Sequence, residues 1–361
     1  MGEIASSDAR ALFTKTLIDV YQQRLRPTDF LRSFFEVEVC PTKEIAIEVE
    51  RQGEFVAVDV FRGTEGNRNS FSLSTEKIFV PPLYKEYFDA TQLDLYDRVL
   101  GSQGNAQVPL FAALMNKVAD RLGSLQNKIE RAIELQCAQI LFNGQVLITS
   151  AVSGNGMIDY RRKTASQVDL TNSTGYWATG SNDPFQALQN GCNFLRQTGK
   201  AAGDVFNVIL GDQALHDLIS NTTFTTRQNL FHMALDSVYP PTREATGAAY
   251  HGTVTAGPYK VQLWSYPQYY DIAVAGSAPT TGNAYINTKY AYMIPVKPKF
   301  KIAHAAVPSL IAEPGQLPAQ GAYVVREFID TRATSHVFEI QTAALAIPVA
   351  VDQIYSMKVV A

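Results

Sequence analysis

The residues that could ligate a metal ion or activate a nucleophile are few and widely spaced in this chain. No two histidines form an HxxxH or HExxH pair, so the spacing that places two imidazoles on one helical face is missing. The cysteines are far apart and form no CxxC pair, which argues against a structural zinc site. Unpaired thiols are typical of a reducing cytoplasm. The residues concerned are His216, His232, His251, His304 and His336, with Cys40, Cys137 and Cys192.

Glycine-rich and acidic motifs supply no active site either. The segment Gly154-Asn155-Gly156 lacks the third glycine of a dinucleotide-binding loop, and the chain has no P-loop and no G-x-S-x-G elbow. The carboxylates of Asp89, Asp94 and Asp97 have the spacing of a solvated face. The sequence therefore predicts no catalytic residue, no cofactor and no metal. An active site assembled from residues distant in sequence would leave no motif and stays open.

The composition describes a chain with more apolar surface than its charge would normally keep in solution alone. Hydrophobic residues make up 46% of the 361 residues and charged residues only 18%, against about 25% in an average soluble protein. The 17 Tyr and 19 Phe add to this surplus, which is typical of chains with large permanent interfaces. A net charge of −3 argues against a nucleic-acid-binding protein, which needs clustered Lys and Arg. No stretch predicts a transmembrane helix.

The longest predicted element is a helix over residues 109–143. Pro109 suits its first turn and Gly144 the position after its last. At about 1.5 Å per residue it forms a rod on the order of 50 Å long. Its charged residues exclude a membrane span, and the lack of a strict heptad argues against a coiled coil, which leaves a core helix or a rigid rod. Polar residues, Glu134 among them, are expected off an apolar stripe that consists of Leu110, Leu114, Val118, Leu122, Leu125, Ile129, Ile133, Cys137 and Ile140.

Before this helix, the sequence predicts a long hairpin that has too few apolar residues to hold a core of its own. Residues 44–80 alternate between apolar and polar types around a Gly/Asn-rich tip at 62–69. Such a hairpin must lie on its own domain or on an adjacent subunit. An amphipathic helix over 7–25 and an apolar patch over 30–35 precede it, and this arm could fold back or cross to a neighbour.

Beyond the long helix, the pattern changes to mixed helices and strands, so the predicted fold class is α+β. In the unit over 182–315, Asp183 is predicted to cap a helix that has Pro184 at its first position. The other predicted elements are a hairpin over 146–160 that turns at 153–156, a buried strand over 205–210, helices over 213–220 and 224–235, strands over 253–255, 259–266 and 290–295, and closing strands over 337–346 and 354–359.

The order of these parts resembles the Hong Kong 97-type capsid fold, and local sequence is similar to the lambda-like phage major capsid proteins, the E family. The residues do not match in 182–315, where only the architecture does. The stretches that carry the resemblance are Phe30-Leu31-Arg32-Ser33-Phe34-Phe35, Glu134-Leu135-Gln136-Cys137-Ala138-Gln139-Ile140-Leu141-Phe142-Asn143-Gly144, Ile158-Asp159-Tyr160-Arg161 with Trp177, and Ile340-Gln341-Thr342-Ala343 with Pro348 and Asp352.

The resemblance implies five parts along the chain. They are an N-terminal arm at 1–43, an extended loop (E-loop) at 44–82, a P-domain at 83–181 with the spine helix at 109–143, an A-domain at 182–315, and strands at 316–361 that return to the P-domain.

The function that the resemblance implies is that of a tailed-phage major capsid protein. Hexamers and pentamers of the chain would close into an icosahedral shell around viral DNA, without sequence-specific contacts and without a membrane. The implied location is the virion, after assembly in the host cytoplasm, and further partners would be a decoration protein, a scaffold and a portal. The residues expected between subunits are Phe30, Phe34, Phe35, Phe61, Arg62, Gly63, Glu65, Arg68 and Phe71.

Two alternatives accompany this interpretation. An encapsulin-like nanocompartment shares the fold but encloses a cargo enzyme. A monomeric α+β enzyme or ligand-binding protein would use the 182–315 unit and predicts a buried polar pocket. Some relatives of the fold join a lysine to an asparagine between subunits; Lys43, Lys77 and Lys85 lie in or beside the hairpin, but they match no such motif, and we expect no covalent cross-link.

Overall fold

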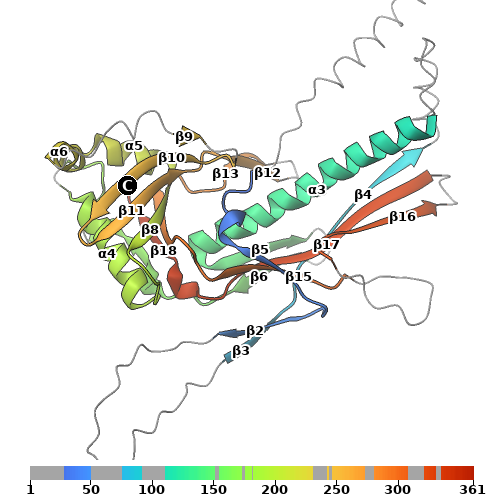
Figure 1. The fold of residues 1–361 in the computed structure, drawn as a ribbon, viewed down its shortest axis with the longest axis horizontal. Coiled ribbons are helices and arrows are strands. Elements are labelled where there is room, and N and C mark those ends of the chain that lie inside the picture. The colour runs from blue at the N-terminus through green and yellow to red at the C-terminus, as the bar shows by residue number, and fades with distance from the viewer. Residues whose placement is uncertain are drawn as a thin grey trace, which may run out of the picture.

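Two sheets and one long helix make up the body of the protein (Figure 1). The structure is a computed structural model, and it describes residues 28–49, 75–91, 110–150, 154–172, 175–180, 182–230, 242–243, 246–272, 280–307, 321–330 and 335–361. A five-stranded sheet lies along the helix, and a seven-stranded sheet with shorter helices forms the other end of the body. This mixed architecture confirms the predicted α+β class.

The five-stranded sheet is built around β17 (Ser335–Pro348), which is 14 residues long and is the common partner of three antiparallel strands. A fifth strand, β1, pairs with β15 in parallel. The remaining strands are β1 (Glu36–Val39), β4 (Leu83–Thr91), β15 (Phe300–Ala305) and β16 (Val324–Asp330).

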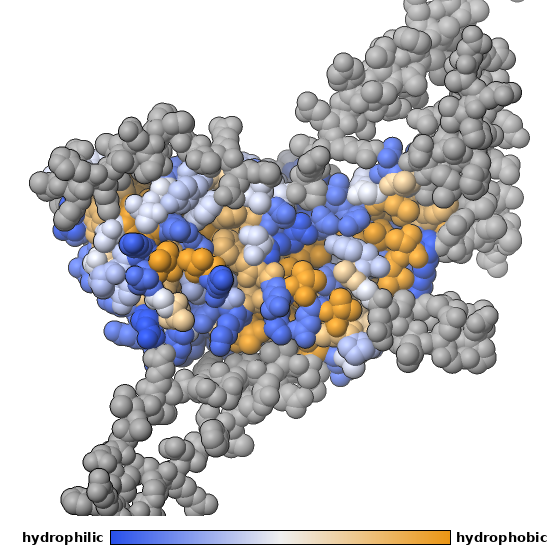
Figure 2. Space-filling view, viewed as in Figure 1, coloured by the Kyte–Doolittle hydropathy of each residue, from blue (hydrophilic) through white to orange (hydrophobic). Residues whose placement is uncertain are grey.

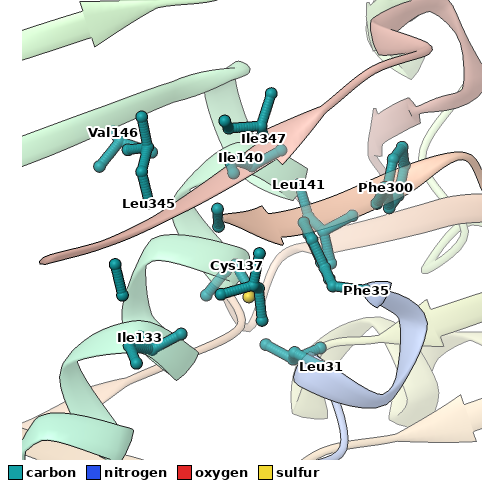
Figure 3. Close-up of a cluster of buried hydrophobic side chains, with 14 of the residues drawn as sticks. Leu31, Phe35, Ile133, Cys137, Ile140, Leu141, Val146, Phe300, Leu345 and Ile347 are labelled. Atoms are coloured by element: carbon teal, nitrogen blue, oxygen red, sulfur yellow. The ribbon is translucent and has the colours of Figure 1, made fainter. Parts of the chain in front are cut away.

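Helix α3 (Leu110–Asn143) confirms the predicted rod and packs against β17. Ile133, Cys137 and Ile140 are buried in a core that also takes in side chains from β5, β15 and β17 (Figure 3). Each large apolar side chain that is fully buried in this way contributes about 1.5–3 kcal/mol. The helix ends at Gly144, which has a φ of 70° and whose N–H donates to the carbonyl of Ile140.

A polar side chain of α3 reaches the backbone of β17, because β17 is lined with alanines at this point. The amide of Gln136 accepts a hydrogen bond from the N–H of Ala346 at 2.9 Å and donates to the carbonyl of Ala344 at 3.3 Å. It also donates to the hydroxyl of Tyr84 on β4 at 2.7 Å. One buried amide therefore fixes the helix to two strands of the sheet.

The seven-stranded sheet has the order β7-β18-β14-β8-β11-β10-β9. Its centre is β8 (Val205–Leu210), the predicted buried strand, which is parallel to β11 and antiparallel to β14. The other strands are β7 (Gln167–Asp169), β9 (Thr242–Arg243), β10 (Ala249–Ala256), β11 (Tyr259–Ser265), β14 (Tyr290–Pro295) and β18 (Tyr355–Lys358).

Three helices accompany this sheet: α4 (Pro184–Gln197), α5 (Asp212–Ser220) and α6 (Thr222–Leu230). The predicted start of α4 is confirmed, because Asp183 caps the helix by accepting a hydrogen bond from the N–H of Phe185 at 3.0 Å. The described part of the third helix begins at Thr222, two residues before the predicted start.

Three short two-stranded sheets complete the described fold. The hairpin of β2 (Ile45–Val49) and β3 (Thr75–Phe79) confirms the root of the predicted long hairpin, whose tip lies outside the described residues. The second predicted hairpin is formed by β5 (Gln145–Ser150) and β6 (Gly154–Asp159). The turn predicted at 153–156 was wrong, because the residues from Gly154 onward already pair with β5. The third pair is β12 (Tyr269–Ile272) with β13 (Thr280–Ala284).

Each of the two sheets takes strands from more than one of the parts expected along the chain. Phe300–Ala305, expected in the 182–315 unit, lies in the five-stranded sheet, and Tyr355–Lys358, expected to return to the P-domain, lies in the seven-stranded sheet. Gln167–Asp169 also belongs to the seven-stranded sheet. The chain crosses between the sheets more than once. The last crossing follows β17, which ends beside β15, and the 3₁₀ turn Val351–Gln353 then leads directly into β18 of the other sheet.

Candidate assembly interface

Among the described residues, two pairs join a buried imidazole to a hydroxyl, as a base contacts a nucleophile: His304 with Thr342, and His251 with Ser265. His251 Nε2 lies 2.7 Å from Ser265 Oγ, on neighbouring strands β10 and β11. Both side chains are buried, and burial lowers the pKa of His251, so its ring is neutral at pH 7. Within the described part of the chain, no carboxylate contacts the second ring nitrogen of His251. This pair satisfies two buried polar groups and lacks the third group that orients a catalytic histidine.

The part of the chain that the structure describes contains neither a candidate metal site nor a helix that could span a membrane. No group of three or more His, Cys, Asp or Glu side chains there could hold a metal ion. Within the same residues, every helix is too short or too polar to span a lipid bilayer.

The strongest polar junction of the body is the buried carboxylate of Glu134 on α3. Its Oε1 accepts hydrogen bonds from the N–H of Leu31 at 2.9 Å and from the hydroxyl of Tyr266 at 2.8 Å. Its Oε2 accepts the N–H of Arg32 at 3.1 Å and lies 3.5 Å from the Nε of the same arginine. One side chain thus holds the N-terminal segment, the long helix and the end of β11 together.

This position corrects the prediction that Glu134 lies off the apolar stripe, since it is fully buried. The stripe is wider than the spacing indicated, because the segment around the 3₁₀ turn Arg32–Phe34 covers a second flank of α3. Burial raises the pKa of Glu134 to about 7, although its hydrogen bonds and Arg32 act in the opposite direction.

A second buried junction is formed by Arg162, which no sequence motif indicates. Its Nη1 donates to the carbonyls of Leu141 and Phe142 at 3.0 and 3.1 Å, the last turn of α3. Its other nitrogens bond Ser166 and Ser356, so the guanidinium joins the helix to the seven-stranded sheet. A cation at the C-terminus of a helix is favourable, and burial lowers the pKa of Arg162 to about 10.

The aromatic residues predicted to contact a neighbouring subunit divide into two groups. Phe30 and Phe35 are 3% and 6% exposed and belong to the core of their own chain. Phe30 packs on Trp264 and Tyr266 of its own chain. These contacts explain its burial without a neighbouring subunit. We therefore remove both from the expected contact set. Phe34 is half-buried and stays in it.

The remaining predicted contact residues lie outside the described residues, in the tip of the hairpin: Phe61, Arg62, Gly63, Glu65, Arg68 and Phe71. The root of this hairpin is fixed to the body, since Ile45 is buried in the main core and the Phe79 ring lies 5.3 Å from that of Tyr160. From there β2 and β3 extend away from the body (Figure 1). Of the lysines considered for a cross-link, Lys85 forms an ion pair with Glu339 at 2.8 Å and Lys43 is exposed.

Apolar side chains also reach the surface of the body. On the face shown in Figure 2 they form several patches separated by hydrophilic residues, with no single continuous apolar area. Leu147 and Met157, which pair across β5 and β6, are more than half exposed. Surfaces of this mixed kind are typical of interfaces with distributed contacts.

Comparison with known proteins identifies the family. A profile described as "Phage major capsid protein E" matches residues 13–359, nearly the whole chain. No curated protein is significantly similar in sequence.

One solved structure supports the same fold at low sequence identity, and others are similar more weakly. A crystal structure of a proposed prophage capsid protein from E. coli CFT073 has a TM-score of 0.60 and 13% identity, and the alignment covers 96% of this chain and 98% of that one. The capsid of Cyanophage P-SCSP1u has a TM-score of 0.48 and 11% identity over 94% and 91% of the two chains. An encapsulin complex from Synechococcus elongatus PCC 7942 has a TM-score of 0.43 and 12% identity over 94% and 90%. Of these three likenesses, only the first is strong enough to support a shared fold.

The family match favours a phage capsid over the encapsulin alternative, and it implies self-association and a place in the virion. The predicted Hong Kong 97-type architecture is confirmed. The chain belongs to the phage major capsid protein E family, whose members form the shell of the virion.

Proposed function

We propose that this chain forms hexamers and pentamers that close into an icosahedral shell around the DNA of a tailed phage. The observation that carries the proposal is the family match over residues 13–359, nearly the whole chain. The role is accordingly structural and not enzymatic. Identical subunits in such rings meet through heterologous contacts, in which two different surfaces of the same chain face each other.

The hairpin is the part of the chain best suited to one side of such a contact. Its root is anchored in the subunit's own core at Ile45 and Phe79, whereas its strands extend from the body (Figure 1). A two-stranded hairpin is marginally stable in water unless it packs on something else. The contact residues of this proposal are Phe34, Phe61, Arg62, Gly63, Glu65, Arg68 and Phe71.

The proposed partners follow from the role. Assembly takes place in the host cytoplasm, and a scaffold, a portal and a decoration protein are the further proteins that we expect the shell to contact. The net charge of −3 suits a container that holds DNA without sequence-specific contacts, since tight binding of phosphates would hinder release of the genome.

Electron microscopy of the purified protein in negative stain, with the mass measured by size-exclusion chromatography, tests the proposal. Closed shells, or rings of five and six subunits, are the expected result. A monomer of 39.7 kDa at every salt and protein concentration, also after coexpression with the scaffold gene of the same phage, would contradict it.

A further inference from the structure

A lysine-rich pocket of about 430 Å³ lies where the N-terminal segment meets the turn between β14 and β15. One wall is apolar, because the buried rings of Phe35 and Phe300 lie 5.1 Å apart there. The other lining residues include Phe34, Glu36, Val296 and Val349. Val296 is 41% exposed, so apolar surface continues to the edge of the pocket.

Three lysines alternate along this lining, in the sequence Lys297-Pro298-Lys299-Phe300-Lys301. Lys301 forms an ion pair with Glu38 at 2.8 Å. Lys297 and Lys299 are exposed, and no ion pair to either of them is found among the described residues. The pocket therefore combines an apolar wall with two lysines that have no acidic partner within the described part of the chain. A site with these properties suits a segment that is acidic and partly apolar.

The same chain contains a segment of that kind. The first arm of the hairpin, residues 44–59, carries five acidic residues against one basic residue, Arg51. Apolar residues such as Ile45, Ile47 and Val49 alternate with these carboxylates. Residues 60–74, which include the tip, carry two arginines and one glutamate, so the acidic character is confined to the arm.

In this structure the described part of the arm, β2, is not among the segments that line the pocket of its own chain. The pocket lies at the start of β1, at Glu36, whereas β2 follows the end of β1 and lies below the body in the view of Figure 1. A second copy of the chain carries the same acidic and partly apolar arm. We propose that the pocket around Lys297 and Lys299 receives the acidic first arm of the hairpin from a second copy of the chain. This inference rests on the proposed function and assigns the surface that faces the hairpin.

Charge reversal with compensation tests the assignment. The double variant Lys297→Glu/Lys299→Glu should fail to form shells under conditions in which the wild-type protein forms them. Adding Glu44→Lys/Glu48→Lys in the same chain should restore assembly, because every copy then carries both reversed surfaces. The matched control is Lys200→Glu/Lys260→Glu, which makes the same change in net charge at exposed positions elsewhere and should assemble normally. Shell yield is measured by sedimentation and microscopy, and circular dichroism checks the fold of each variant.

The outcomes separate this inference from the proposed function. If the wild-type protein forms no shells with its scaffold present, the proposed function fails before the pocket is tested. If wild-type shells form and the Lys297→Glu/Lys299→Glu protein assembles equally well, the pocket is not an assembly contact. Assembly that is lost but not restored by the hairpin reversal would exclude this occupant. Normal shells that retain less DNA would show that the lysines face nucleic acid, which also overturns the assignment.

Discussion

Replacing Glu134 by glutamine should change how the stability of the subunit depends on pH. The pKa of Glu134 rises from 4.5 in the unfolded chain to about 7 in the folded one, because burial disfavours its charged form. The folded state therefore binds a proton more tightly than the unfolded state does. The stability that this proton linkage contributes is fully present below pH 4.5 and is lost as the pH rises through 7.

The size of the effect follows from the pKa difference. One pKa unit corresponds to about 1.4 kcal/mol, so the unfolding free energy should fall by about 3 kcal/mol between pH 4 and pH 8 through this one group. Roughly 2 kcal/mol of that loss falls between pH 5.5 and pH 8. In the Glu134→Gln variant this contribution disappears, since an amide does not titrate. The variant should also be less stable than the wild type at pH 5.5, by about 1 kcal/mol, because its NH₂ group faces the N–H donors of Leu31 or Arg32.

Urea unfolding of dissociated subunits, followed by tryptophan fluorescence, measures both free energies at the two pH values. The expected result is that the advantage of the wild type over Glu134→Gln shrinks by about 2 kcal/mol, or reverses, between pH 5.5 and pH 8. Glu130→Gln is the matched control, because it removes a partly exposed carboxylate that contacts Arg32 from the same helix. Parallel pH profiles for the wild type and Glu134→Gln would refute the reasoning. They would mean that the four contacts of the carboxylate keep it charged at all these pH values.

Three further substitutions test the packing of the body, each by its shift in the urea midpoint. Arg162→Lys should cost about 2–4 kcal/mol, because one ammonium cannot replace the hydrogen bonds by which the guanidinium joins α3 to β18. A loss below 0.5 kcal/mol, within the range of neutral surface changes, would contradict this junction. Asp183→Ala should cost about 1 kcal/mol through loss of the cap of α4, and an unchanged midpoint would show that the cap contributes nothing. Gly191→Ala should cost about 1–3 kcal/mol, because its Cβ would overlap the sulfur of Met293. The control Gly123→Ala, a helical glycine with open space around it, should instead stabilise the subunit by up to about 1 kcal/mol, and equal effects of the two changes would contradict the packing argument.

The elements that the sequence predicted correctly are those fixed by neighbours in the chain. The spacing of apolar residues over 109–143 depends only on the helical period, and the structure has α3 at Leu110–Asn143. The cap at Asp183 depends on a contact two residues away. The root of the hairpin at 44–80 followed from alternation with a period of two, and β2 pairs with β3 in a regular antiparallel register.

The features that the sequence did not predict depend on contacts between distant segments. Nothing near Tyr355–Lys358 indicates that this strand lies between β7 and β14 in the seven-stranded sheet. Glu134 could have been noticed, because it lies between Ile133 and Cys137 and therefore close to the apolar stripe. Its partners at Leu31 and Arg32, however, lie about a hundred positions earlier in the chain. For Arg162 no local signal exists, since it acts only after α3 and β18 have met.

The interface between subunits adds a further reason why its residues resist prediction. A core residue has its partners in the same chain, and burial then identifies it, as it does for Phe30 and Phe35, which the sequence had placed between subunits. In a single subunit, an interface residue is recognised only by the absence of a packing or charge partner. The acidic arm at 44–59 has too few apolar residues for a core of its own, and Lys297 and Lys299 have no acidic partner among the described residues. Each feature alone describes an ordinary solvated surface, and the two become informative only because identical copies must present both surfaces to one another. The charge-reversal experiment uses this property, since a compensating change in one gene alters both sides of every contact at once.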